Sequence, residues 1–178
     1  MVPSGRAHDR ALLDALEGYK PQPFAGDVWR ITRKGREALR GSAAKGRWSP
    51  DGEIEVLYTS LERDGALAEI GIRLALEPIW PSRIEHEIHT IQATVERTLR
   101  FADVASLRPL GVDTDRYESF DYAATQAIAA AAHFLEFDGL IVPSARAACA
   151  NLVVFMDRMA TALSLTHSEA VDWATWRT

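Results

Sequence analysis

The chain has 178 residues, which is enough for one domain with a substantial core, and its 25 acidic and 20 basic side chains give a net charge of −5. Hydrophobic residues make up 47% of the chain and charged residues 25%, which is typical of a soluble globular protein. This composition excludes disorder, collagen and a coiled coil, and the acidic balance argues against a protein that coats nucleic acid.

The net charge conceals one strongly basic segment. Residues 30–47 contain seven basic side chains and a single acidic one, Glu37, which is an excess of +6. The rest of the chain therefore carries −11. On charge alone, this segment is either a solvated loop or a surface that attracts an anion.

The first predicted element is a helix over residues 8–19. Its apolar residues recur at helical spacing on one face: Leu12, Leu13, Leu16 and Tyr19. Gly18, followed by Pro21 and Pro23, ends it. We assign residues 1–27 to an N-terminal helical extension of the domain.

Two short strands are expected next, VWRIT (28–32) and EVLYTS (55–60), with a basic loop over residues 33–47 between them. The basic residues inside this loop are expected to be solvated. Asp64 is then expected to cap a helix that stops before Pro78.

The second half of the chain contains both strand and helix patterns. Residues 84–101 have strand character with a bend near Arg97, which predicts two strands in sequence. The alanine-rich segment 122–137 contains no Gly or Pro and predicts a helix. LIVPS (140–144) and NLVVFM (151–156) are short apolar runs bounded by turn residues, as buried strands are.

These elements predict a single α+β domain in which helices surround a mixed β-sheet core. A helical tail over 158–178 is expected to pack on this domain. We see no internal repeat and no low-complexity linker in the chain.

Cysteine content and the apolar segments indicate the compartment. The single cysteine, Cys149, excludes an intramolecular disulfide and any site built from several cysteines. Residues 1–16 lack the apolar run of a signal peptide, and polar residues interrupt the most apolar later stretch, 123–137. We therefore expect a cytoplasmic protein that does not contact a membrane.

Several residues could bind a nucleotide. Arg47 and Trp48 combine a guanidinium fork, which suits phosphate, with an aromatic face for stacking. On spacing alone, however, we favour a solvated arginine and a core tryptophan. Arg30 lies inside a strand, where it can face either solvent or a ligand. Tyr58 and Ser60 share one side of the next strand, where a tyrosine either stacks on a flat ring or fills the core.

Other residues could carry chemistry. Glu69 lies between apolar neighbours, where a carboxylate can act as a general base, stabilise positive charge on a sugar carbon, or simply lie on the surface. Ser144 follows a buried strand but is not in a G-x-S-x-G motif. His86 and His89 would face opposite sides of a strand and cannot share a metal. The zinc-protease, Walker and dinucleotide motifs are absent.

Taken together and in order, five segments resemble the RES domain family, named for its Arg, Glu and Ser. They are WRI (29–31), GRWSPDG (46–52), VLYTS (56–60), ALAEI (66–70) and FDGLIVPSARAACANLVVF (137–155). The resemblance implies a RES domain over residues 28–157. RES proteins are toxins of bacterial toxin–antitoxin pairs whose antitoxin is an Xre-type DNA-binding protein. Their fold is similar to that of the ADP-ribosyltransferases, and their co-substrate is NAD+.

The resemblance implies an NAD+ pocket in this chain. Arg30 and Arg47 would hold the dinucleotide and take part in catalysis, and Tyr58 would pack on the nicotinamide. Trp48 and Ser60 would complete the cofactor-binding set.

The resemblance also implies the catalytic group. Glu69 would stabilise the positive charge that develops on the ribose when nicotinamide leaves, and Ser144 would bind the ribose or the nicotinamide amide. No metal is expected.

The expected function is that of a toxin that cleaves the nicotinamide–ribose bond of NAD+. As acceptor of ADP-ribose we favour a protein, with phosphate or water as the alternatives that would deplete NAD+. The implied partner is an Xre-type antitoxin that occludes the pocket. The residues alone leave two other classes open: a hydrolase that uses Ser144, and a module that binds single-stranded nucleic acid through the basic loop.

Overall fold

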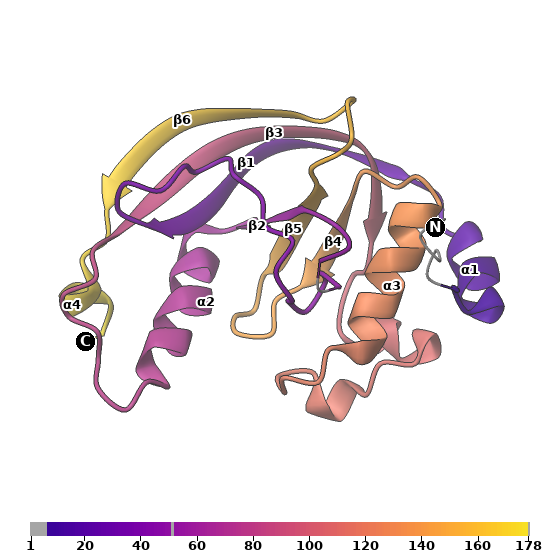
Figure 1. Ribbon diagram of the computed structural model, residues 1–178, viewed down its shortest axis with the longest axis horizontal. Helices are drawn as coiled ribbons and strands as arrows, with labels where there is room; N and C mark the ends of the chain where they lie inside the picture. The colour runs from indigo at the N-terminus through magenta and orange to yellow at the C-terminus, as the bar shows by residue number, and fades with distance from the viewer. Residues whose placement is uncertain (1–6, 51, 178) are drawn as a thin grey trace.

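The computed structural model of the chain describes residues 7–50 and 52–177 (Figure 1). Residues 1–6 of the expected extension and Asp51 of the GRWSPDG motif lie outside the described residues. The elements are α1 (Arg10–Glu17), β1 (Gln22–Arg33), β2 (Val56–Ser60), α2 (Arg63–Ala75), β3 (His86–Arg100), the 3₁₀ helices Ala105–Leu110 and Thr114–Arg116, α3 (Ala123–Phe134), β4 (Gly139–Pro143), β5 (Ala150–Phe155), β6 (Ala162–Ala170) and α4 (Trp173–Trp176).

The strands form one mixed sheet in the order β1-β2-β5-β4-β3-β6, and β1 also pairs with β3. That extra pairing brings the sheet back on itself, so β1, β2, β5, β4 and β3 follow one another around a ring and β6 lies outside it. Only β3 and β4 are parallel; the other pairs are antiparallel. The expected α+β class with a mixed sheet is confirmed.

Strand β1 is much longer than the expected strand over 28–32. It begins at Gln22, inside the segment assigned to a helical extension, because it pairs with β3 along almost its whole length. Pro23 falls at the irregularity between Gln22 and Phe24, where a strand tolerates a residue without an N–H. The pairing with β3 therefore determines the structure of this segment, although its prolines favour a turn.

The two strands expected over 84–101 are one continuous strand, β3. Its partner on one side changes along its length: β6 pairs with Glu87–Thr94, and β4 pairs from Thr98 to Arg100. The sequence therefore indicated strand correctly, but no break occurs near Arg97.

The helical tail expected over 158–178 is wrong for most of its length. This part of the chain forms β6, which pairs with β3, and only the four residues of α4 are helical. Most of β6 is exposed and its apolar residues are few, so the local pattern carries little sign of the pairing.

Two helix ends also differ from expectation. Glu62 precedes α2 as its N-cap, and Asp64 lies in the first turn, where a carboxylate still favours the helix dipole. Helix α3 ends before Glu136, which takes the left-handed conformation with φ 63°, and so stops short of the expected end at residue 137. The N–H of Phe137 then bonds the carbonyl of Ala132 at 3.1 Å and closes the helix.

The helices pack on two separated parts of the sheet (Figure 1). Helices α1 and α3 contribute to the largest apolar cluster, with β4 and β5, whereas α2 and α4 pack in another cluster against β1 and β3. Between these two parts of the sheet, β1 and β2 diverge. None of the helices in the described part of the chain is long and apolar enough to cross a membrane.

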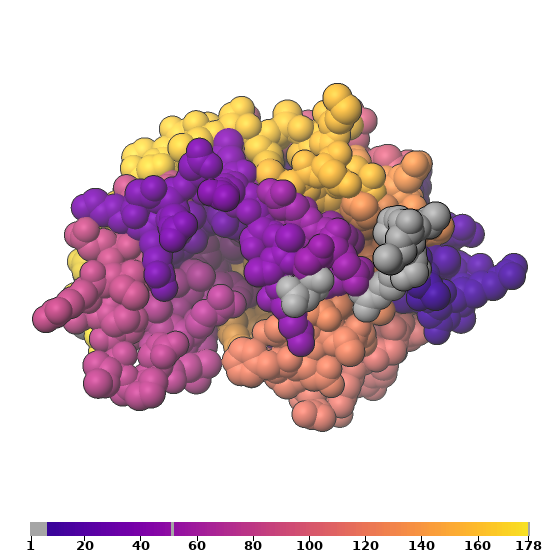
Figure 2. Space-filling model, in the orientation of Figure 1, coloured from indigo at the N-terminus to yellow at the C-terminus, as the bar shows by residue number. Residues whose placement is uncertain are grey.

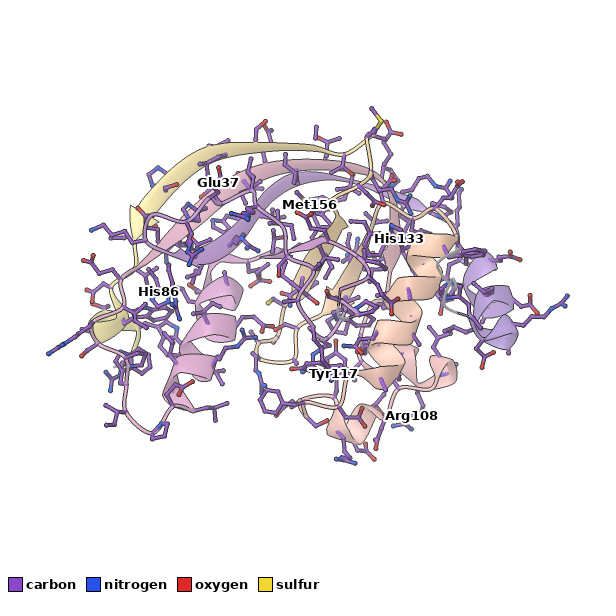
Figure 3. The ribbon with its side chains drawn as sticks, in the orientation of Figure 1. Glu37, His86, Arg108, Tyr117, His133 and Met156 are labelled. Atoms are coloured by element: carbon purple, nitrogen blue, oxygen red, sulfur yellow. The ribbon has the colours of Figure 1, made fainter. Side chains whose placement is uncertain are left out.

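Two buried histidines tie the C-terminal segment to the sheet. His89 lies between Thr32 Oγ1, at 2.8 Å, and Ser168 Oγ, at 2.7 Å. His86, which lies close to α4 (Figure 3), accepts a hydrogen bond from Trp173 Nε1 at 3.0 Å. Burial lowers the pKa of both histidines below the ordinary value.

These histidines predict a loss of stability in acid. An imidazole whose pKa is lower in the folded chain binds protons more readily when unfolded, so the free energy of unfolding is at its full value above about pH 6.5 and falls as the pH drops below it. Urea denaturation from about pH 8 to about pH 5 should show this fall, and His89→Gln should reduce its slope. His167→Gln, at an exposed position of β6, is the control. If the free energy of unfolding fell equally steeply with pH in His89→Gln and in the wild type, His89 would not be a cause of the fall.

Candidate active site

A cavity of about 360 Å³ opens where β1 and β2 part. These two strands pair only at Trp29 and Ser60, and beyond that pair they diverge. The walls come from β1, β2, α2, the loop over 42–48 and the turn after β4. Figure 2 shows the surface hollowed between the magenta segment that contains α2 and the orange segment that leads into α3.

Arg30 bridges the gap between the diverging strands. Its Nη1 donates to the carbonyl of Tyr58 at 3.1 Å, and its Nη2 donates to the carbonyl of Arg40 at 3.3 Å. Its Nε is buried without a hydrogen-bond partner among the described residues. Burial also lowers the pKa of Arg30. The guanidinium therefore faces the cavity and joins β1, β2 and the basic loop.

Arg47 is held by the segment that precedes α3. Its guanidinium donates to the carbonyls of Tyr117 and Ser119, and it lies 4.9 Å from the ring centre of Tyr117 and 4.8 Å from that of Tyr122. Tyr117 is labelled in Figure 3. The solvated arginine that the spacing favoured is therefore wrong, because Arg47 is half-buried in the cavity wall.

Trp48 and Tyr58 form the adjoining wall. Trp48 is only 2% exposed and packs in the core, as the spacing favoured, so its ring offers little surface to a ligand. Its backbone N–H donates to Tyr58 Oη at 3.0 Å. Burial raises the pKa of Tyr58 to about 12, which keeps the phenol neutral. Ser60, also buried, accepts a hydrogen bond from the N–H of Glu62 at 3.2 Å and lines the cavity.

Glu69 points from α2 into the cavity and is locked by two donors. Its Oε1 accepts from Ser144 Oγ at 2.6 Å and from Asn151 Nδ2 at 3.1 Å. Ser144 Oγ in turn accepts from the N–H groups of Arg146 and Ala147, at 3.1 and 3.2 Å. The sequence analysis missed Asn151; its only local signal is a polar residue at the start of the apolar run 151–156.

This arrangement separates two roles. Glu69 and Asn151 line the cavity, whereas Ser144 contacts Glu69 and is not among the residues that line it. Ser144 also has no histidine as a hydrogen-bond partner among the described residues. The alternative of a serine hydrolase, which needs such a base, is therefore not supported.

The cavity is strongly cationic. Among the described residues that line it, five carry positive charge and only Glu69 carries negative charge. The five are Arg30, Lys45, Arg47, Arg73 and Arg146. Such a cavity can hold an anion of several charges and place one carboxylate against a centre that becomes positive.

The other charged and metal-binding candidates lie elsewhere. Of the basic residues between Arg30 and Arg47, Lys45 is exposed to solvent, as expected, but also lines the cavity, whereas Lys34 pairs with Glu85 at 3.0 Å. In the described ranges, no group of three or more His, Cys, Asp or Glu side chains is arranged to hold a metal ion.

Comparison with known proteins gives consistent matches. The model of the RES domain matches residues 27–174. The NAD(+) phosphorylase MbcT of Mycobacterium tuberculosis is 23% identical over 145 residues, which cover 78% of each chain. The probable NAD(+) phosphorylase Rv3189 of the same organism is 33% identical over 149 residues, which cover 82% of this chain and 71% of the relative.

The solved M. tuberculosis MbcT–MbcA toxin–antitoxin complex contains a chain of similar fold. The TM-score is 0.82 at 22% sequence identity, and the match covers 96% of this chain and 97% of the other.

The contact between the basic loop and Tyr58 predicts a cost for any side chain at Gly46. A Cβ there would lie 2.6 Å from Tyr58 Oη and 3.2 Å from Cζ, so the half-buried ring would have to move. Gly46→Ala should lower the free energy of unfolding by about 1–3 kcal/mol, as overpacking does. Urea denaturation measures this. Gly26→Ala is the control, because its nearest contact is an ordinary 3.5 Å, and an equal effect in both variants would contradict the prediction.

Proposed function

The chain belongs to the RES domain family, and from that premise we propose that it is the toxin of a toxin–antitoxin pair and degrades NAD+ by phosphorolysis. Relatives over most of its length are named NAD(+) phosphorylases, which favours phosphate over the protein acceptor that the sequence analysis favoured. The single observation that carries the proposal is one locked carboxylate, Glu69, in a cavity lined by cationic side chains. The sheet closes on itself through the pairing of β1 with β3 and opens where β1 and β2 diverge, and this arrangement also supports an ADP-ribosyltransferase-like fold.

Binding of NAD+ follows from its charges. The pyrophosphate is anionic, and arginine holds such a group through paired, charge-assisted hydrogen bonds. Arg30 and Arg47 are held in place by backbone carbonyls, so they present charge to the pyrophosphate or the nicotinamide ribose from fixed positions. Tyr58 packs on the nicotinamide, next to Ser60, and Trp48 supports this wall from the core.

The reaction exchanges one bond at the anomeric carbon. The bond between that carbon and the nicotinamide nitrogen breaks, its electron pair stays on the nitrogen, and neutral nicotinamide leaves. The ribose carbon becomes positively charged, and a phosphate oxygen then forms the new bond. The products are nicotinamide and an ADP-ribose phosphorylated at this carbon, and the proton of the phosphate is retained in the step.

Glu69 stabilises the positive charge that develops on the ribose. Ser144 and Asn151 both donate to its Oε1, so the carboxylate is oriented before the substrate binds. Ser144 is therefore a positioning residue that acts through Glu69, in place of the direct contact with ribose or nicotinamide that the resemblance implied.

Measurement of the products tests the function. We expect the purified protein to release nicotinamide from NAD+ and, in phosphate buffer, to form the phosphorylated ADP-ribose. Glu69→Gln should lower kcat by about a hundredfold to a thousandfold with the melting temperature unchanged, because a contact made in the transition state is lost. Glu62→Gln, at the start of the same helix and outside the cavity, is the control.

Three results would contradict this proposal. Formation of unphosphorylated ADP-ribose alone, even in phosphate, would indicate hydrolysis. Transfer of ADP-ribose to a protein in a cell lysate would indicate that the acceptor is a protein. Full activity of Glu69→Gln would show that the carboxylate has no role in the reaction.

The partner of this toxin is proposed to be an Xre-type antitoxin. A chain of similar fold has been solved in a toxin–antitoxin complex. A cationic cavity suits an acidic C-terminal segment of the antitoxin, which would exclude NAD+. Mixing the purified pair should stop NAD+ consumption, and an antitoxin truncated before its C-terminal segment should not. Unchanged consumption with the intact antitoxin would contradict occlusion.

A further inference from the structure

The four arginines of the cavity fall into two groups. Arg30 and Arg47 each donate two hydrogen bonds to backbone carbonyls, which fixes them in the wall. By contrast, the side chains of Arg73 and Arg146 line the same cavity without a hydrogen bond or ion pair to any described residue. Their N–H groups are therefore available to an anion.

These two free arginines flank Glu69. Arg73 follows Glu69 by four residues on α2, so both side chains lie on one face of the helix, one turn apart. Arg146 belongs to the turn after β4, where its own backbone N–H bonds Ser144 Oγ at 3.1 Å, and that hydroxyl donates to Glu69. One free guanidinium thus comes from the helix that carries the carboxylate and one from the turn that carries its donor Ser144.

An exposed phenylalanine orients one of them. Phe120 is 66% exposed, yet the guanidinium of Arg146 lies 5.5 Å from the centre of its ring. The ring of Phe120 also contacts the ring of Tyr122, and the guanidinium of Arg47 lies over that second ring. Stacking on the face of a ring leaves the N–H edges of a guanidinium free, so Arg146 is oriented without losing its donors.

The acceptor of the proposed reaction needs such a subsite. Phosphate must approach the carbon that Glu69 faces, and a doubly charged anion is repelled by a carboxylate at short distance. Positive side chains beside Glu69 offset this repulsion and hold the phosphate oxygens through charge-assisted hydrogen bonds. Water as acceptor carries no charge and requires neither arginine.

We propose that Arg73 and Arg146 form the subsite for the acceptor phosphate and that Phe120 is the positioning residue for Arg146. This inference rests on the proposed phosphorolysis of NAD+. It separates two anion-binding functions in one cavity: Arg30 and Arg47 serve the dinucleotide, and the free pair serves the acceptor.

Steady-state kinetics with NAD+ and inorganic phosphate varied independently tests the subsite. Arg73→Gln and Arg146→Gln should each raise the KM for phosphate by about tenfold to a hundredfold, the loss expected for a hydrogen bond to a charged group. The KM for NAD+ should change less than about twofold. The product should shift from phosphorylated to free ADP-ribose, because water then competes with phosphate.

Matched variants separate this role from a general loss of charge or fold. Arg63→Gln removes an arginine from the same helix outside the cavity, where it pairs with Glu169, and should leave both KM values unchanged. Phe120→Leu should raise the KM for phosphate, and Phe120→Tyr, which keeps the ring, should restore it. Phe134→Leu, at another exposed phenylalanine, is the control.

The outcomes distinguish the inference from the function beneath it. A wild type that consumes no NAD+, or whose products do not depend on phosphate, overturns the proposed function. A wild type that forms phosphorylated ADP-ribose, with Arg73→Gln and Arg146→Gln raising the KM for NAD+ instead of phosphate, overturns only the subsite and assigns these arginines to the dinucleotide.

Discussion

The divergence of β1 from β2 is the constraint on which the site depends. Strand β1 follows β3 almost from end to end, whereas β2 follows β5, so the two can meet only at Trp29 and Ser60. Past that point the facing backbone groups lack a partner strand, and an unpaired buried carbonyl is costly. The guanidinium of Arg30 supplies the missing donor to Tyr58 and brings a positive charge to the floor of the opening. The same defect in the sheet thus creates the cavity and makes it cationic.

The rest of the site is built from segments that are far apart along the chain. Helix α2 supplies Glu69, the turn after β4 supplies its donor Ser144, and the segment before α3 closes around Arg47. The fixed and free arginines therefore occupy different walls. A cavity with this division can bind a large anion without consuming the donors that a second, smaller anion needs.

Local patterns predicted the buried strands β2, β4 and β5 and the alanine-rich helix α3, because an apolar run or high helix propensity is legible without knowledge of neighbours. They failed for β6, which is polar, exposed and defined by pairing with β3. In the site, the order of the motifs along the chain indicated Arg30 and Glu69, and both residues line the cavity in the structure. Arg73 carries no local signal, and Asn151 carries only that of a polar residue at the start of an apolar run, since the importance of both arises from what the fold places beside Glu69.

The hydrogen bonds that orient Glu69 also determine at which point of its synthesis the chain can complete the site. Its donors Ser144 and Asn151 lie 75 and 82 positions later in the sequence, at the two ends of the turn that joins β4 to β5. A chain that ends before this hairpin contains Arg30, Arg47 and Arg73 but lacks Arg146 and both donors, so its Glu69 carboxylate has no fixed direction. The complete site therefore forms only after most of the chain has been synthesised.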